Sequence, residues 1–144
     1  MNTRKQRILF ICTHNSARSQ MAEAFLNTYY GNRYEGYSAG LEPKRINKYV
    51  IQAMHEVGID ISDQQPKSVE RFRKMRFDYA VTVCDHAREA CPFFPADRIL
   101  HKSFADPASF KGTAEEIQDR TRDVRNQIEA WIRKTFGNAE PSSS

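Results

Sequence analysis

Residues 8–19 read Ile8-Leu9-Phe10-Ile11-Cys12-Thr13-His14-Asn15-Ser16-Ala17-Arg18-Ser19, and this stretch decides the fold. Its apolar first part predicts a buried strand over 7–11. A helix is predicted directly after it, over 17–30, because Met21, Ala24, Phe25 and Tyr29 recur at helical spacing. A strand that leads through a tight turn into a helix is a typical unit of α/β proteins.

The turn carries the pattern Cys-x5-Arg, from Cys12 to Arg18. Backbone N–H groups and the positive end of the following helix favour a tetrahedral oxyanion there. The same field is expected to lower the pKa of Cys12 and hold a thiolate. Arg18 can grip two anion oxygens, and the Ser19 hydroxyl could donate a hydrogen bond to the thiolate. The predicted oxyanion-binding residues are Thr13, His14, Asn15, Ser16, Ala17 and Arg18. The alternative is a buried cysteine beside an unrelated arginine, but the position directly after a strand favours the anion site.

Strand and helix patterns alternate along the rest of the chain. Further strands are predicted over 34–38, 77–83 and 98–101, and helices over 47–57 and 67–75. A capping box at Thr113-Ala114-Glu115-Glu116 opens a long last helix whose apolar residues are expected in the core. These patterns predict an α/β fold with one domain over residues 1–137. Its four-stranded parallel sheet has helices on both faces, and residues 138–144 form a disordered tail. Ligands bind such sheets at the carboxyl ends of the strands, where Cys12 lies.

Composition narrows the class of protein. The chain has 144 residues, 40% of them hydrophobic and 28% charged, which is typical of a soluble globular domain. No signal peptide or membrane-spanning stretch is evident, and three cysteines do not suggest a secreted disulfide framework. We therefore expect a cytoplasmic protein, which we also expect to be a monomer. The net charge of +4 and pI of about 9.0 come from scattered basic residues, so nucleic acid is not an expected partner.

Cys84 and Cys91 form a second group of candidate residues. Cys84 follows the 77–83 strand, and Cys91 lies seven positions later, after a polar stretch over 85–90 that is predicted to be a loop. If this segment meets the Cys12 loop at one end of the sheet, the three thiols could meet and supply electrons, whereas hydrolysis needs only one cysteine. The alternative is a zinc site that adds His86 and His101 as ligands. The spacing of the cysteines is loose for such a site, and a metal at Cys12 would leave the anion loop unused.

Asp106 is the candidate general acid. It precedes Pro107 in the segment before the last helix, and the proline restricts it to extended geometry. Near the anion loop it could protonate a leaving oxygen. The alternative is an ordinary Asp-Pro turn.

Together these motifs resemble the thioredoxin-coupled arsenate reductases, which are built on the low-molecular-weight protein tyrosine phosphatase fold. The resemblance runs from Ile8 to about Trp131. It is carried by Phe10-Ile11-Cys12-Thr13, Asn15-Ser16, Arg18-Ser19-Gln20-Met21-Ala22-Glu23, Tyr37-Ser38-Ala39-Gly40, Ala53-Met54, Ile59-Asp60-Ile61-Ser62, Val81-Thr82-Val83-Cys84, Cys91-Pro92 and Asp106-Pro107-Ala108.

The resemblance implies a three-cysteine relay. Cys12 attacks arsenate held by the loop and Arg18, and Asp106 helps water to leave. Cys84 then attacks Cys12, which releases arsenite, and Cys91 takes over the disulfide for reduction by thioredoxin. Residues 85–90 would have to rearrange in this last step, and their sequence has no large apolar anchor. No organic cofactor or bound catalytic metal is implied.

The chain departs from this family at several positions. His14 stands where glycine is frequent, and Ala17 replaces a cysteine common in phosphatase loops. Ala108 and Ser109 stand where tyrosine phosphatases have an aromatic pair. Some reductases bind an alkali-metal ion through residues that match Asn15, Glu23 and Ser38, but Lys67 lies here near the position of an acidic ligand. Two alternatives stay open: a low-molecular-weight phosphatase, and a non-catalytic thiol-based sensor of arsenic or redox state.

Overall fold

The computed structural model describes residues 4–90 and 94–137. Cys91 and the predicted tail over 138–144 therefore lie outside the described residues.

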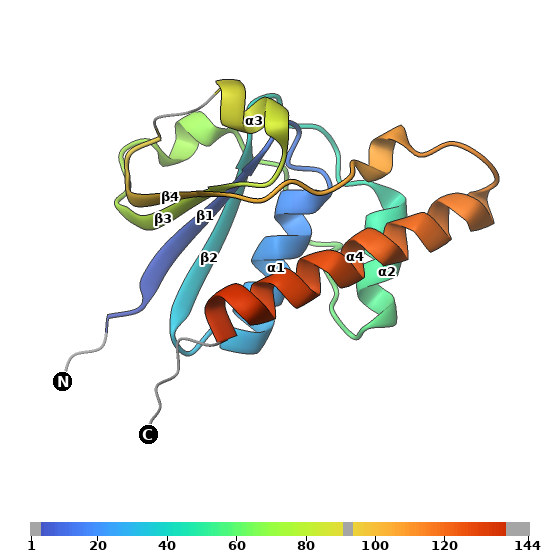
Figure 1. Ribbon diagram of the computed structural model, residues 1–144, viewed down its shortest axis with the longest axis horizontal. Helices are drawn as coiled ribbons and strands as arrows, with labels where there is room; N and C mark the ends of the chain where they lie inside the picture. The colour runs from blue at the N-terminus through green and yellow to red at the C-terminus, as the bar shows by residue number, and fades with distance from the viewer. Residues whose placement is uncertain (1–3, 91–93, 138–144) are drawn as a thin grey trace.

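A four-stranded, fully parallel sheet forms the centre of the fold, in the order β2-β1-β3-β4 (Figure 1). The strands are β1 (Gln6–Cys12), β2 (Tyr34–Gly40), β3 (Phe77–Thr82) and β4 (Ala96–His101). The α-helices are α1 (Arg18–Tyr30), α2 (Lys48–Glu56), α3 (Asp85–Ala90) and α4 (Ala114–Phe136), and two 3₁₀ turns are η1 (Val69–Phe72) and η2 (Pro107–Ser109). The predicted α/β class and the four parallel strands are confirmed.

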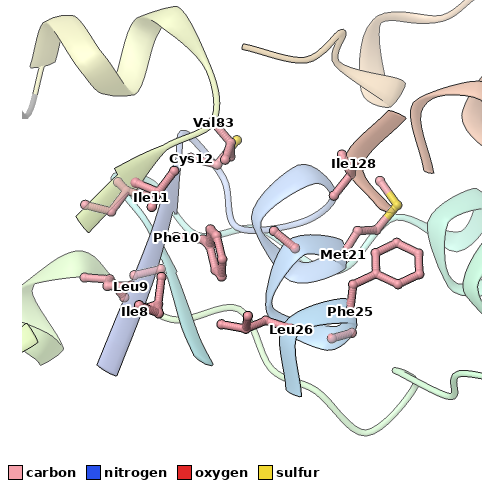
Figure 2. Packing of buried hydrophobic residues seen from close by; sticks show 14 of the residues in the cluster. Ile8, Leu9, Phe10, Ile11, Cys12, Met21, Phe25, Leu26, Val83 and Ile128 are labelled. Atoms are coloured by element: carbon pink, nitrogen blue, oxygen red, sulfur yellow. The ribbon is translucent and has the colours of Figure 1, made fainter. Parts of the chain in front are cut away.

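Side chains from both faces of the sheet are buried. Phe10 of β1 packs edge-on against Phe136 of α4, with ring centroids 6.2 Å apart. Figure 2 shows Phe10 directed from β1 toward α1. Tyr37 of β2 pairs with Leu9 in the sheet register and so points to the opposite face, where its ring lies 5.8 Å from that of Phe72 in η1. The prediction of helical elements on both faces is therefore confirmed.

Helix α4 begins where the sequence predicts. The Thr113 hydroxyl accepts a hydrogen bond from the Glu116 N–H, and the Glu116 carboxylate accepts one from the Thr113 N–H. Val124, Ile128 and Ile132 are buried on one side of the helix, which packs across α1 and α2. No helix within the described residues is long and apolar enough to cross a membrane.

Three predicted elements differ from the structure. The helix predicted over 67–75 is only the single 3₁₀ turn η1, which Ser68 caps by accepting a hydrogen bond from the Glu70 N–H. The strand predicted over 34–38 continues to Gly40, in register with Cys12. Residues 85–90, predicted as a loop, form helix α3, because alanine, arginine and glutamate favour helix and Asp85 stands in its first turn.

Candidate active site

The carboxyl ends of the strands bring the predicted site residues together. Cys12 ends β1 beside Gly40, the last residue of β2. Beyond the end of β3, the Val83 N–H donates to the Ile11 carbonyl at 2.9 Å, so the chain reaches Cys84 alongside Cys12. The Phe104 N–H donates to the Val83 carbonyl at 3.3 Å, which brings the segment with Asp106 to the same edge.

Asn15 fixes the shape of the anion loop, defined here as residues 12–18. It is fully buried and has a φ of 52°, a left-handed conformation that asparagine tolerates better than most residues. Its Nδ2 donates to Ser19 Oγ at 2.8 Å. Its Oδ1 accepts from Gln20 Nε2 at 3.0 Å and from the Lys67 N–H at 2.8 Å. The bend in the loop is thus held from both α1 and the segment before η1.

The segment after β2 holds the loop carbonyls. Backbone N–H groups of residues 41–47 donate to the carbonyls of Cys12, Thr13, His14 and Ser16 at 2.7–3.2 Å. Within the described residues, no backbone carbonyl accepts a bond from the N–H groups of residues 13–17. The Thr13 N–H bonds to the Cys12 thiol, and the N–H groups of residues 14–17 are available to a ligand. The predicted binding loop therefore has the backbone arrangement that an oxyanion requires.

Gly40 permits the close approach of β2 to this loop. A Cβ at this position would lie 2.8 Å from both the Asn15 nitrogen and the His14 carbonyl carbon. Both are backbone atoms held by the bonds described above, so a side chain would displace the loop. This requirement concerns space, since the φ of Gly40 is not in the left-handed region.

Arg18 lies at the start of α1 and faces Asp106. The two side chains form an ion pair with 3.4 Å between Arg18 Nη2 and Asp106 Oδ2, and Arg18 Nη1 donates to the Phe104 carbonyl at 3.2 Å. The Arg18 side chain is 9% exposed, and its Nε has no hydrogen-bond partner among the described residues. The helix cap, Ala17, provides no side-chain bond to the first turn. A bound oxyanion would accept hydrogen bonds both from Arg18 Nε and from the N–H groups of the first turn of α1.

Cys12 and Cys84 form a buried pair of free thiols. The neighbouring Cys12 thiol lowers the pKa of Cys84 to about 5, together with Thr13 Oγ1 and the Ala87 N–H, which both lie 3.4 Å from Cys84 Sγ. The interaction with Cys84 and burial raise the pKa of Cys12, although Arg18 and the Thr13 N–H oppose this. The pair thus carries one readily formed negative charge and one shared proton. The sequence-based expectation of a Cys12 thiolate did not include this coupling, because no pattern within one segment shows that Cys84 lies beside Cys12.

The remaining predicted residues are placed as follows. Ser19 is buried and accepts from Asn15; no bond from it to Cys12 is formed in the described structure. His14 Nδ1 bonds to the Glu42 carbonyl at 2.9 Å, so its ring lies against the 41–47 segment. Asp106 also accepts from the Ala108 N–H at 3.0 Å and caps η2, so the turn and the site contact both occur.

The ligands of the alternative zinc site do not gather within the described residues. His86 is exposed on α3. His101 Nδ1 bonds to Thr82 at 2.8 Å and its Nε2 to Asp85 at 3.1 Å. The described part of the chain has no group of three or more histidine, cysteine and acidic side chains arranged to hold a metal ion.

Two contributors to the site were not identified as such from the sequence. Gln20 is fully buried and bonds to both the carbonyl and the side chain of Asn15. The Phe104 carbonyl orients Arg18. A glutamine two positions after the loop arginine gives only a weak sequence signal, and its role becomes clear from its burial in the structure. The position of a backbone carbonyl cannot be recognised from a sequence pattern.

Comparison with known proteins agrees with this geometry. Residues 7–137 match the family described as low molecular weight phosphotyrosine protein phosphatase. An arsenate reductase from Halalkalibacterium halodurans is 42% identical over 133 residues, which cover 92% of this chain and 95% of that protein. An arsenate reductase from Shouchella clausii is 44% identical over 131 residues, 90% of this chain and 94% of that one.

Solved structures show the same fold. An arsenate reductase in the phosphate binding state superposes with a TM-score of 0.74 at 27% identity, covering 94% of this chain and 99% of that chain. A thioredoxin-dependent arsenate reductase from Corynebacterium glutamicum superposes with a TM-score of 0.63 at 29% identity, covering 94% of this chain and 65% of that one.

Proposed function

Because the chain belongs to the low molecular weight phosphotyrosine protein phosphatase family, we propose that it reduces arsenate to arsenite with its own thiols and is recycled by thioredoxin. The observation that carries the proposal is the buried Cys12–Cys84 pair beside the anion loop. A phosphatase needs one nucleophilic cysteine, whereas reduction needs a second thiol within reach of the first. The relatives named arsenate reductase support this choice.

The first step forms a bond between Cys12 and arsenic. Cys12 passes its proton to Cys84, and its sulfur attacks arsenate held by the loop N–H groups and Arg18. One arsenic–oxygen bond breaks, and the oxygen leaves as water after it receives protons. Asp106, 3.4 Å from Arg18 and 35% exposed, is placed to deliver such a proton. Arsenic remains in the +5 state in this adduct.

The second step transfers two electrons. The Cys84 sulfur, after losing its proton, attacks Cys12, and a Cys12–Cys84 disulfide forms. The electron pair of the sulfur–arsenic bond remains on arsenic, which leaves as arsenite in the +3 state. The two cysteine sulfurs are oxidised by the same two electrons.

The third step moves the disulfide away from the loop. Cys91 attacks Cys84, so that the Cys12 thiol returns and a Cys84–Cys91 disulfide forms. A reduced thioredoxin then takes up the oxidation by thiol exchange. Support for this partner comes from the Corynebacterium glutamicum neighbour, which is named as thioredoxin-dependent. A thioredoxin partner also favours a reducing compartment such as the cytoplasm.

A phosphatase is the second candidate, because the loop and Arg18 would hold phosphate equally well. A phosphotyrosine substrate is disfavoured, because the exposed residues Ala108 and Ser109 follow Asp106-Pro107. Neither has an aromatic side chain that could pack against a phenyl ring. A sensor without turnover is the third candidate, since a buried thiol pair could bind arsenite.

One coupled assay separates these candidates. NADPH oxidation is followed with thioredoxin, thioredoxin reductase and arsenate, and in parallel with glutathione and glutaredoxin. We expect arsenate-dependent oxidation with thioredoxin. Rapid hydrolysis of p-nitrophenyl phosphate that survives Cys84→Ser, without arsenate turnover, would instead favour the phosphatase. Tight arsenite binding without any turnover would favour the sensor.

A further inference from the structure

Two opposite charges, Glu23 and Lys67, lie next to the residues that hold Asn15 of the anion loop. Glu23 comes from α1 and Lys67 from the segment before η1, and their side chains are only 17% and 16% exposed. Glu23 Oε1 lies 3.9 Å from Lys67 Nζ and accepts a hydrogen bond from the Ser38 hydroxyl. Burial raises the pKa of Glu23 and lowers that of Lys67, while their mutual attraction acts in the opposite direction.

Lys67 is tied directly to the residues that shape the loop. Its N–H donates to Asn15 Oδ1 at 2.8 Å, and its carbonyl accepts from the Gly40 N–H at 2.8 Å. Its ammonium donates to the Gln65 carbonyl at 2.8 Å, which also accepts from Gln20 Nε2. A displacement of Lys67 would therefore also move Asn15, whose left-handed backbone sets the bend of the loop.

This arrangement does not fit the alkali-metal ion that some related reductases bind. Oxygen atoms of Glu23, Ser38 and Asn15 are suitable ligands for such an ion. Here, however, the Lys67 ammonium is already within ion-pair distance of Glu23. A second cation beside it would be repelled, because both charges would lie in a partly buried region where screening is weak.

We infer that Lys67 is an internal cation that makes the anion loop independent of alkali-metal ions. It acts as a positioning residue: it neutralises Glu23, which would otherwise repel an oxyanion, and its backbone holds Asn15. The inference rests only on the oxyanion-binding part of the proposed function, so its test needs no arsenate turnover.

The test uses inorganic phosphate as the probe and Lys67→Met as the variant, because methionine keeps much of the length without the charge. Phosphate affinity is measured by calorimetry in potassium chloride and in choline chloride of equal ionic strength, with thermal unfolding in the same buffers. Lys74→Met, which removes an exposed lysine, controls for the loss of one positive charge.

We expect the wild type and Lys74→Met to bind phosphate equally well in both salts. Lys67→Met should bind roughly 3- to 30-fold more weakly in choline chloride, the size of a coupling between contacting charges. Potassium should restore part of the affinity and raise the melting temperature. In Lys67→Met/Glu23→Gln the affinity should return in choline chloride, since no uncompensated carboxylate remains.

Two results would overturn the inference. One is a Lys67→Met protein with the phosphate affinity and melting temperature of Lys74→Met. The other is a damaged Lys67→Met protein that neither potassium nor Glu23→Gln improves. A wild type that binds no phosphate would count against the proposed function instead, and the melting temperatures would then still test the Lys67–Glu23 pairing.

Discussion

The anion loop and helix α3 follow two neighbouring strands, β1 and β3, yet they are held in different ways. The loop is fixed by hydrogen bonds from α1, from the 41–47 segment and from Lys67. Helix α3 has six residues, and Ala87 is its one buried side chain among those described. Its first residue, Asp85, bonds to His101, the last residue of β4, and to Ser103, two residues later.

The difference matches the two tasks in the proposed reaction. Binding and attack require groups fixed in advance around the oxyanion. Passing a disulfide outward requires a segment that can open locally at low cost, and a short helix with little buried surface meets that requirement. The two regions meet where Cys12 lies beside Cys84, which directly precedes α3 and accepts from the Ala87 N–H of that helix.

Of the substitutions considered, removal of the nucleophile Cys12 in the anion loop should reduce activity most. Cys12→Ser is expected to lower kcat/KM for arsenate by at least about 1,000-fold, because a serine hydroxyl stays protonated where a thiol ionises. Any hydrolysis of p-nitrophenyl phosphate should disappear in the same variant. Retention of either activity would show that Cys12 is not the nucleophile.

The contact between the two regions can be broken by Cys12→Ala. In the wild type, thiolate absorbance should show one ionisation at a pH of about 5, since the neighbouring Cys12 thiol, as a hydrogen-bond donor, lowers the pKa of Cys84. Without that donor the pKa of Cys84 should rise toward the ordinary thiol value of about 8.5. An ultraviolet pH titration of both proteins, with Cys91→Ser in each background, measures the shift. An unchanged low ionisation in Cys12→Ala would disprove the shared proton.

The shape of the loop can be disturbed from β2. A Cβ in Gly40→Ala would collide with the backbone of Asn15 and His14. We expect about 10- to 100-fold weaker kcat/KM for arsenate, because small displacements of binding groups cost this much. Phosphate titration by calorimetry should show a matching loss of affinity. Gly36→Ala, whose Cβ would have side-chain atoms of Asn27 and Leu26 as its nearest neighbours, is the matched control and should lose less.

Loosening α3 should have the smallest effect. Asp85→Asn weakens the bonds to His101 and Ser103 and the ion pair with Arg88. Amide hydrogen exchange in α3 should become roughly two- to fivefold faster, as expected for a small loss of local stability. Phosphate affinity should not change, since no residue of the anion loop is touched. Asp97→Asn, which breaks an exposed ion pair with Arg76, serves as the control. A loss of phosphate affinity in Asp85→Asn would mean that the two regions are not separable.

The sequence was sufficient for the parts of the fold that long apolar patterns or caps define. The Ile8–Ile11 run predicted β1, and the Thr113 capping box predicted the start of α4. Helix α3 and turn η1 were not correctly predicted, because six and four residues are too few to establish a helical period.

The site shows the same division. Cys12, Arg18 and Asp106 were identified because their chemistry is carried by side chains in a motif, and the structure brings them together. The shared proton, the role of Gln20 and the carbonyl of Phe104 depend on tertiary contacts between segments far apart in the chain. No pattern within a single segment contains that information.

Single-turnover arsenite release tests most directly the proposed division of the reaction, in which Cys12 attacks arsenate and Cys84 and Cys91 carry the disulfide away from the anion loop. Reduced Cys91→Ser and Cys84→Ser proteins are mixed with arsenate without thioredoxin, and disulfides are mapped by mass spectrometry. We expect Cys91→Ser to release about one arsenite per protein and to stop as a Cys12–Cys84 disulfide, by the stoichiometry of thiol exchange. Cys84→Ser should release almost none. If Cys91→Ser turns over repeatedly with thioredoxin at the wild-type rate, or if Cys84→Ser releases arsenite normally, the account is contradicted.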